Sequence, residues 1–514
     1  MPPSGYLTAV AIENGLDKLH SSYPSLTQLI SLPERSAGEE QRTIRALRIR
    51  SGEDERNGVL LIGGTHAREL INPDLLLALA LNISWAYHNG QGLLFGAPKK
   101  LPNASPSTGS LAPPFPGKEY SATEIRRIVE GLDIFIVPNI NPDGREWVQS
   151  PMGYQWWRQN RGFNSDGTRG ADLNRNYDFL WQCHIGSSTD STKETYRGDA
   201  VFSEPETRNV RWLFRTYPQI TCFADVHSFG QLVLYPWGEA ENQSDDPTKN
   251  FQNPAWDGKR DPDFAYGEYI PAADEPKFID RGEKVRDAIA AVHERRYTLE
   301  QGVDHAAVSG AAKDYAYSRF FRGAATKVWG YTIETNHRGT SGNHDEDDQY
   351  GYQPPYADAL LVMEEVQSGL IQFMLTCLCV VREIGRKPIG PGRPIEPDEL
   401  DQLRRFRDRE MLEQRRGRRW VEVLDRHGDE LLGLLHRDAR ARREAEHILA
   451  EGTRIVLARD SERPPVIDKA LATRIDRLAM RLERHASPQL RKALSATRKD
   501  TRVIVGKTAR NALR

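Results

Sequence analysis

The stretch Gly63–Asp74, GGTHARELINPD, follows an apolar run and carries a histidine and a glutamate three residues apart. Asn72 and Pro73 suit the N-cap and the first position of a helix that begins there. A tight turn aims His66 and Glu69 at one point, where an imidazole nitrogen and a carboxylate oxygen can bind zinc. The plainer interpretation is an exposed His–Glu pair at a strand end. The stretch therefore predicts a strand-to-helix turn that is a candidate metal site.

Two further polar residues end apolar runs and complete this candidate site. His227 follows the run FADV, and a histidine at the carboxyl end of a strand can supply a third metal ligand. Glu334 ends the run GYTIE, where its carboxylate can take a proton from an attacking water. Each residue also has a plainer interpretation: a capping or core histidine, and a surface glutamate that begins a loop.

Arginines gather in one polar segment, residues 156–181, WWRQNRGFNSDGTRGADLNRNYDFLW. Guanidinium groups bind carboxylates at two points, so this segment is a candidate anion clamp. A solvated polar loop is the plainer interpretation. A nucleic-acid interpretation is weaker, because residues 1–390 hold 40 basic and 51 acidic side chains.

Strand-like and helix-like segments alternate along the first part of the chain. The strand candidates are Val59–Ile62, Ile134–Val137, Cys222–Val226, Leu232–Tyr235 and Val328–Ile333. The helix candidates are Asp74–His88, Glu204–Thr216, Ile279–Arg295 and Ala357–Val381. This alternation favours an α/β sandwich around a largely parallel or mixed sheet. The polar stretches Gly90–Pro116 and Glu239–Pro276 are expected as surface insertions.

A change of composition near residue 390 predicts a second part of the chain. Residues 386–397 are rich in proline and glycine, as linkers are, so we expect a catalytic domain over residues 1–385 and a separate region over residues 398–514. Residues 391–514 hold 30 basic and 21 acidic side chains. Five apolar residues there share one helical stripe, which predicts a mainly helical region of unknown role: Ile467, Leu471, Ile475, Leu478 and Leu482.

The composition excludes several classes of protein. The longest nearly apolar run, Gly369–Val381, is too short to span a bilayer, and the N-terminus lacks the pattern of a secretory signal. Four cysteines are too few for a disulfide scaffold. Cys183 and Cys222 are expected as buried thiols, and Cys377 and Cys379 are too close to bridge. We therefore expect no membrane contact and a reducing, cytoplasmic setting.

Seven motifs stand in a fixed order along the chain. They are HARE (66–69), NPDG (141–144), RQNR (158–161), DLNRNYD (172–178), HSFGQ (227–231), SGAAKDYAY (309–317) and YTIE (331–334). With these motifs the chain resembles the zinc carboxypeptidases of the M14 family over roughly residues 20–385. The resemblance implies a three-layer α/β/α sandwich with a mixed sheet of about eight strands. It also implies hydrolysis of the last peptide bond of peptides or proteins.

The resemblance assigns chemical roles to single residues. It implies one zinc ion per chain, held by His66, Glu69 and His227. It makes Glu334 the general base. It gives Arg161 the task of polarising the scissile carbonyl and steadying the oxyanion.

The resemblance also assigns substrate contacts. It implies that Asn174 and Arg175 hold the terminal carboxylate of the peptide. Arg68 and Arg158 match further arginines along the substrate groove. One position departs from the family pattern, because the mobile tyrosine expected three residues before the serine of the SG turn is Ala306 here.

Lys313 bears on specificity. In the family, the residue before the Asp–aromatic pair of the SG turn lies at the base of the pocket for the departing side chain, and here that residue is Lys313. A buried lysine needs a counter-charge, so we expect a preference for acidic C-terminal residues. The alternative is that Lys313 reaches solvent and leaves a roomy, unselective pocket.

Two other classes of function stay open. One is an amidohydrolase on the same fold that acts on peptidoglycan or amino-acid conjugates, although the missing export signal argues against a peptidoglycan substrate. The other is a zinc- or peptide-binding module without turnover, which would need a lost ligand or base. Nucleic acid is not expected at the catalytic domain, and phosphate contacts by the basic C-terminal region are left open.

Overall fold

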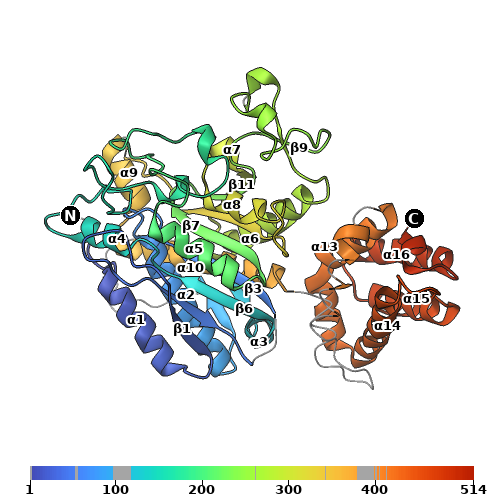
Figure 1. Cartoon of the computed structure of the whole chain (residues 1–514). Coiled ribbons are helices and arrows are strands. Elements are labelled where there is room, and N and C mark those ends of the chain that lie inside the picture. Colours follow the sequence, from blue (N-terminus) through green and yellow to red (C-terminus); the bar gives the residue numbers. More distant parts are fainter. Residues whose placement is uncertain are drawn as a thin grey trace. The chain divides into compact units, whose positions relative to one another are not determined.

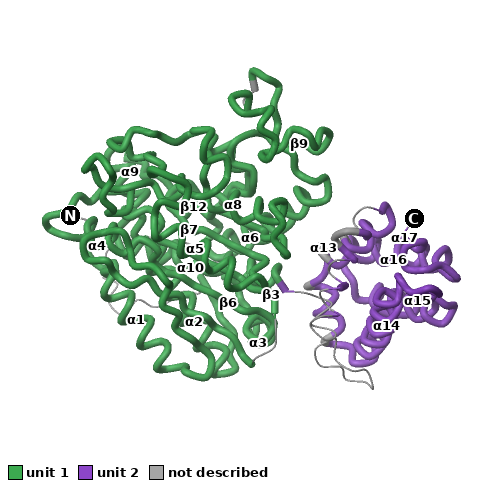
Figure 2. Tube along the Cα trace, viewed as in Figure 1, with its two compact units in different colours: residues 1–377 green, residues 378–514 purple. Residues whose placement is uncertain are grey.

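The computed structural model covers the whole chain. It describes residues 3–52, 56–96, 117–260, 262–341, 343–378, 399, 402–403, 406–411 and 414–513. Two compact units are present, which we call unit 1 (residues 1–377) and unit 2 (residues 378–514) (Figure 2). The predicted linker, residues 386–397, lies outside the described residues.

Unit 1 is built on a mixed sheet of eight strands (Figure 1). In spatial order these are β1 (Thr27–Ser31), β2 (Arg45–Ile49), β6 (Leu132–Val137), β3 (Asn57–Gly63), β7 (Ile220–Ser228), β12 (Trp329–Thr335), β8 (Leu232–Tyr235) and β11 (Thr298–Gln301). The four central strands β6, β3, β7 and β12 run parallel to one another. They are almost wholly buried, which explains why their sequences are apolar without alternation.

Helices cover both faces of this sheet. Successive side chains of a strand point to opposite faces, so Cys222 and Phe223 of β7 contact the helical layers on opposite sides of the sheet. Phe223 packs against Phe214 of α5 (Pro205–Thr216), with ring centroids 5.4 Å apart. Cys222 is bonded to Cys377, directly after α10 (Tyr356–Thr376). The prediction of a three-layer α/β/α sandwich is confirmed.

The remaining elements of unit 1 complete the two helical layers and the loops. The layer of α10 also holds α2 (Ile71–His88), α3 (Ala122–Gly131) and α6 (Glu275–His293). The others are α1 (Ala9–Ser22), α4 (Pro142–Gln149), α7 (Gly302–His305), α8 (Ala312–Ser318), α9 (His344–Tyr352), β4 (Leu93–Phe95), β5 (Lys118–Tyr120), β9 (Asn242–Gln243) and β10 (Glu268–Tyr269). None of the described helices has both the length and the apolar character needed to cross a membrane.

All five predicted strands are present in the eight-stranded sheet, and its three other strands, β1, β2 and β11, are short and partly polar. The predicted start of α2 is wrong by two residues. The helix begins at Ile71 with Leu70 as its N-cap, so Asn72 lies inside the first turn and is buried. Its side chain accepts hydrogen bonds from Thr335 Oγ1 (3.2 Å) and Ser228 Oγ (3.4 Å) and so ties α2 to two central strands.

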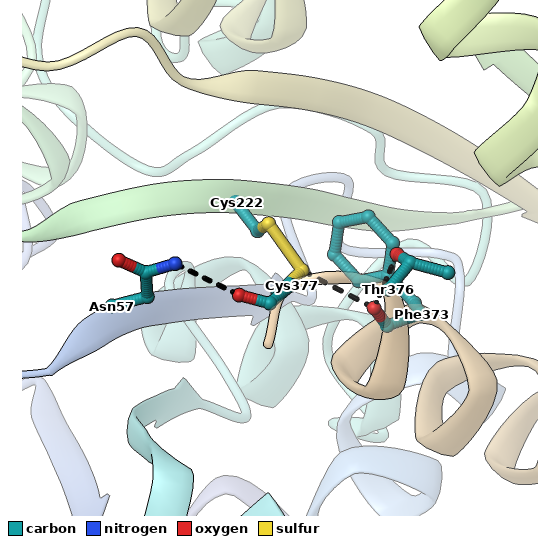
Figure 3. The surroundings of a disulfide bond; sticks show 5 residues. All are labelled: Asn57, Cys222, Phe373, Thr376 and Cys377. Atoms are coloured by element: carbon teal, nitrogen blue, oxygen red, sulfur yellow. Dashed lines mark hydrogen bonds between the residues drawn. A yellow bond between two sulfur atoms is a disulfide. The ribbon is translucent and has the colours of Figure 1, made fainter. Parts of the chain in front are cut away.

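The expectation that Cys222 is a free thiol is wrong. Cys222 of β7 forms a disulfide with Cys377, across 155 residues of sequence (Figure 3). The carbonyl of Cys377 also accepts a hydrogen bond from Asn57 Nδ2 of β3 (2.9 Å) (Figure 3). The end of α10 is thereby fixed to two central strands. Cys183 is free and partly buried, as expected.

Unit 2 is helical, as predicted. Its main helices are α13 (Arg415–Arg437), α14 (Ala439–Leu457), α15 (Lys469–Glu483), α16 (Pro488–Ile504) and α17 (Ala509–Leu513). Two separate apolar clusters hold them together. Ile467 lies just before α15, the other four residues of the predicted stripe lie along α15, and together they contribute to both clusters. Single-faced burial of this kind is what amphipathic helices of a small bundle require.

Candidate metal centre

Three parallel central strands bring the candidate residues to one edge of the sheet. His66 and Glu69 follow β3, His227 lies near the end of β7, and Glu334 lies near the end of β12. These strands are neighbours in the order β3, β7, β12. Glu334 is paired directly with His227 in the β12–β7 register. Because the carboxyl ends of parallel strands meet at one edge, residues far apart in sequence share one site.

His66, Glu69 and His227 form a buried cluster whose ligand atoms all lie within 4.8 Å of one another. His66 Nδ1 lies 2.8 Å from Glu69 Oε1 and 3.1 Å from His227 Nδ1. His227 Nδ1 lies 3.2 Å from Glu69 Oε2. Ligand atoms about 2.0–2.2 Å from a tetrahedral zinc would be about 3.3–3.6 Å apart. Two nitrogens and one carboxylate therefore converge with nearly the spacing that a zinc ion needs.

The far side of each imidazole faces a buried carboxylate. His66 Nε2 is 3.0 Å from Asp172 Oδ1, and His227 Nε2 is 2.8 Å from Asp225 Oδ2. Thr65 Oγ1 donates to the other oxygen of Asp225 (2.9 Å). Histidines that bind metal commonly donate their second ring N–H to a carboxylate, which leaves the opposite nitrogen free to coordinate. Both Nδ1 atoms are thereby directed into the cluster, so the residues present fit a zinc ion.

Charges within the cluster shift its titrating groups. Burial alone would raise the pKa of the Glu69 carboxyl, but His66 and His227 outweigh it and lower that pKa. Burial alone would lower the pKa of His227, but Asp225 and Glu69 raise it well above its usual value. Burial raises the pKa of Glu334 to about 8, with the charge of His227 acting in the opposite direction. Glu334 can therefore hold and release a proton near neutral pH.

Asp172 connects the metal cluster to two arginines. Arg158 Nε donates to its Oδ2 (3.0 Å), and Arg175 Nη1 lies 4.0 Å from the same oxygen. Burial would raise the pKa of Asp172, but Arg158, Arg175 and His66 hold it well below its usual value. The side chains of Arg158 and Arg175 are only 15% and 11% exposed. Two guanidinium groups thus stand beside the candidate metal site.

Asn174 lies next to this arginine pair. Its side-chain oxygen accepts a hydrogen bond from the backbone N–H of Ala312 (2.9 Å), so its amide nitrogen is the group left for a ligand. Arg175 Nε donates to the carbonyl of Gly186 (2.8 Å), which fixes the guanidinium. An amide N–H and a guanidinium side by side match the oxygens of a carboxylate.

The profile of the peptidase family described as "Zinc carboxypeptidase" matches residues 12–368. The chain belongs to the zinc carboxypeptidase family. Its M14 motifs therefore lie in a family domain that coincides with unit 1.

Known relatives agree with this membership. Carboxypeptidase B from Helicoverpa zea is 29% identical over 246 residues, which cover 46% of this chain and 48% of the relative. Carboxypeptidase O from Bos taurus is 28% identical over 255 residues, which cover 49% of this chain and 56% of the relative. The chain thus spans about half the length of these two relatives. A solved structure of thrombin activatable fibrinolysis inhibitor has a TM-score of 0.52 and 20% identity over 72% of this chain and 73% of that one, so it shares the fold.

Arg161, predicted to polarise the scissile carbonyl, does not lie at the metal cluster. Its guanidinium lies over the rings of Trp147 and Trp157, 4.1 and 4.8 Å from their centroids. Burial and the charge of Arg169 lower its pKa. By contrast, the charges that most strongly raise the pKa of Arg158 are those of Asp172 and Glu69. The first arginine of the RQNR motif, not the second, therefore faces the zinc carboxypeptidase site.

Arg68 lies at the rim of the site. It donates to the carbonyl of Trp156 (3.2 Å) and to the carboxylate of Glu194 (3.1 Å). It also donates to the hydroxyl of Tyr352 (3.2 Å). Sequence reasoning did not single out Tyr352, because nothing in its local pattern points to a site 284 residues from Arg68.

Lys313 is buried rather than extended into solvent. Its Nζ lies 2.9 Å from Asp314 Oδ2, and both side chains are at most 3% exposed. A Cβ atom on Gly238 would lie 2.6 Å from the same ammonium, so Gly238 packs directly against it. Burial and the charges of Lys313 and Arg175 lower the pKa of His305. The counter-charge that we expected from a substrate is thus already supplied by Asp314.

Asp172 and Asp225 are the functional residues that sequence reasoning missed. The sequence position of each aspartate could have identified it. Asp172 opens the DLNRNYD motif, and Asp225 lies two residues before His227 on the same face of β7. A carboxylate spaced to face the back of a ligating histidine is the pattern to search for.

Proposed function

We propose that the protein is a zinc-dependent carboxypeptidase that removes the C-terminal residue of peptides or proteins and binds one zinc per chain. The observation that carries this proposal is the convergence of His66 Nδ1, His227 Nδ1 and the Glu69 carboxylate beside Glu334. Zinc bound there would polarise a carbonyl and make a water acidic enough to react at neutral pH. The same edge of the sheet presents Arg158, which can stabilise negative charge on that carbonyl.

The chain's own residues account for the remaining chemistry. Arg175 and the amide of Asn174 hold the terminal carboxylate and so align the last peptide bond. Glu334 accepts a proton from the attacking water as the new C–O bond forms. Arg158 donates hydrogen bonds to the oxyanion in place of Arg161. Glu334 then gives the proton to the amine as the C–N bond breaks, and both products leave.

A library of peptides that differ in their last residue tests this function directly. With zinc, the protein should release single C-terminal residues, and a chelator should stop the release. Glu334→Gln should retain zinc and lower turnover by about 10²–10⁴. Release of internal fragments, or hydrolysis only of amide conjugates that are not peptides, would contradict the proposal.

We further propose a preference for acidic over basic C-terminal residues. Lys313 and Arg175 place positive charge near the pocket, and Asp314 neutralises only one of them. The test compares kcat/KM for peptides that end in Glu, Phe and Arg. Lys313→Met leaves Asp314 without its partner and should shift the ranking towards Arg. A wild-type preference for Arg, or an unchanged ranking in the variant, would refute the acidic preference.

A further inference from the structure

The positive charge of unit 2 is confined to the last part of the chain. Residues 391–468 hold 17 basic and 18 acidic side chains, whereas residues 469–514 hold 13 basic and 3 acidic side chains. The second segment contains the helices α15, α16 and α17. Basic side chains gathered in one segment are the electrostatic footprint of a surface that meets an anionic partner.

The three acidic side chains of this segment are already paired with arginines. Asp476 Oδ1 and Glu483 Oε2 lie 2.9 and 3.2 Å from nitrogens of Arg498. Asp500 is buried and accepts a hydrogen bond from Arg419 Nη2 (2.6 Å). These carboxylates are therefore engaged elsewhere and do not neutralise the remaining basic side chains of α16.

One face of α16 is fixed in the core of unit 2. Leu490 and Leu494 belong to one apolar cluster, and Ile504 belongs to the other. Thr501 is also buried. Because successive side chains of a helix are rotated by about 100°, these four lie within about 80° of one another. The opposite face of α16 is therefore turned to solvent.

This outward face carries a basic stripe, which consists of Lys492, Ser495, Lys499 and Arg502. All four residues are exposed. Their spacing also places them within about 80° of one another around the helix, and the stripe is about 15 Å long. Across the described part of the chain, their side chains form no hydrogen bond or ion pair.

The basic stripe does not stabilise unit 2. Lys499 and Arg502 are three residues apart, a spacing at which like charges destabilise a helix slightly. No carboxylate of α16 offsets this repulsion, because Asp500 is buried against Arg419. The charge of the stripe is thus available to a partner outside the chain.

The surroundings of the stripe argue against a membrane or a protein as that partner. A helix that binds a membrane surface needs an apolar face beside its basic residues. Of the large apolar side chains of α16, a helix that the structure describes in full, only Val503 is exposed. Protein interfaces likewise depend on apolar or aromatic anchors at their centre. A polyanion is therefore the better match.

Among polyanions, duplex DNA fits best. Single strands are held mainly by stacking on aromatic rings, and residues 469–514 contain no Phe, Trp or Tyr. The phosphates of duplex DNA supply one negative charge per about 1.7 Å of its axis, so several lie within the length of the stripe. The major groove of B-form DNA also admits an exposed helix, whereas that of A-form RNA is too narrow.

We propose that the basic stripe of α16 binds the phosphate backbone of duplex DNA through Lys492, Lys499 and Arg502, with the Ser495 hydroxyl as a further donor. Contacts with phosphates carry no sequence information, so binding is independent of base sequence. The inference goes beyond the proposed carboxypeptidase function and does not depend on it, because unit 2 lies after the residues that match the family, 12–368.

Fluorescence anisotropy of a labelled duplex tests the proposal with the full-length protein at several salt concentrations. The Kd should be on the order of 10⁻⁶ M at about 0.1 M salt, and it should rise with salt with a log–log slope of about 3. The triple variant Lys492→Gln, Lys499→Gln and Arg502→Gln should weaken binding at least about tenfold and lower that slope by about 2–3.

The matched control removes the same charge from another helix. Arg440→Gln, Arg443→Gln and Arg454→Gln together replace three exposed arginines of α14. This second triple variant should weaken binding less than about threefold, because charges outside the interface are largely screened beyond about 10 Å. Circular dichroism and melting temperature show whether both variants are folded, and both should hydrolyse peptides as the wild type does.

A single variant keeps the test decisive if the first triple variant does not fold. Lys499→Gln alone should lower the salt slope by about 1. No binding of the duplex at about 0.05 M salt, or equal losses in the two triple variants, would overturn the proposal. So would tighter binding to a single strand, to an RNA duplex of the same length, or to phosphatidylcholine vesicles with about a quarter phosphatidylserine.

Discussion

Unit 1 has a set of fully buried charged side chains around its metal cluster, whereas many described ion pairs of unit 2 lie at the surface. In unit 1, Asp172 and Asp225 are fully buried, and each faces a histidine of the metal cluster. In unit 2, pairs such as Arg481–Asp438 lie at the surface, with side chains 40% and 28% exposed. Asp500, buried against Arg419, is an exception in unit 2. Buried ion pairs offset a large desolvation cost only when every group has a partner, whereas surface pairs contribute about 0–1 kcal/mol.

This contrast indicates what each set of charges is for. The buried charges of unit 1 are a poor way to stabilise a core, so their value lies in orienting His66, His227 and Arg158. The surface charges of unit 2 contribute little to its stability, which depends on two apolar clusters. Substitution of the site residues of unit 1 should therefore abolish or lower peptidase activity. Removal of unit 2 should leave that activity unchanged.

The largest effect is expected from His66→Ala. Removing one of three ligands should abolish stoichiometric zinc binding and bring peptidase activity to the detection limit. Metal analysis and a peptide assay on the same sample measure both. His88→Ala, at the exposed end of α2, is the control and should keep one zinc and full activity. A His66→Ala protein with bound zinc and normal turnover would show that His66 is not a zinc ligand.

The next effect separates the two arginines of the RQNR motif. Arg158→Ala should lower kcat by about 10²–10³, because it removes a donor to the oxyanion. Arg161→Ala should change kcat little, since its guanidinium stacks on Trp147 and Trp157. Steady-state kinetics of both variants decide between them. The reverse ranking would restore Arg161 to the role that the sequence suggested.

A stability effect is expected from the disulfide. Cys377→Ser opens a loop of 155 residues and should lower the unfolding free energy of unit 1 by about 3–5 kcal/mol. Denaturant unfolding followed by fluorescence measures this. Cys183→Ser removes a free thiol and is the control. An unchanged midpoint for Cys377→Ser would mean that the disulfide adds nothing to unit 1.

The smallest effect is expected from removing unit 2. A chain that ends at residue 385 keeps Cys377 and should retain kcat/KM within about a factor of two, since unit 1 is a compact unit that carries all the proposed site residues. Peptide hydrolysis at equal zinc occupancy checks this. A large loss of activity that returns when unit 2 is added separately would show that the two units depend on each other.

The parts of the site that were predictable from sequence are those at strand ends. An apolar run that ends in His227 or Glu334 predicts a buried strand with that side chain at its carboxyl end. Because neighbouring parallel strands end at the same edge of the sheet, these residues come together there. The choice between Arg158 and Arg161 was not predictable, because both belong to one loop and the stacking of Arg161 depends on Trp147, which lies before that loop. The resemblance suggested Arg161, whereas the geometry favours Arg158, and the kinetics of the two variants decide between them.

Other features depend on contacts between distant segments. The disulfide joins residues that no local pattern relates, so Cys222 looked like a buried thiol. Tyr352 ends a short polar helix, and it meets Arg68 and Phe229 only because the fold brings distant segments together. The pairing of Lys313 with Asp314 was local, but whether the lysine reaches solvent depended on the surrounding core. The cytoplasmic setting and the role of unit 2 stay predictions.

The disulfide also has a topological consequence. It closes residues 222–377 into a covalent ring that contains the insertion 239–276 and Glu334. A protease that cuts the insertion once opens the backbone but releases no fragment, because the two pieces remain joined through sulfur. Nicked protein would keep its full mass on a gel without reducing agent. It would separate into two chains only when the bond between Cys222 and Cys377 is reduced.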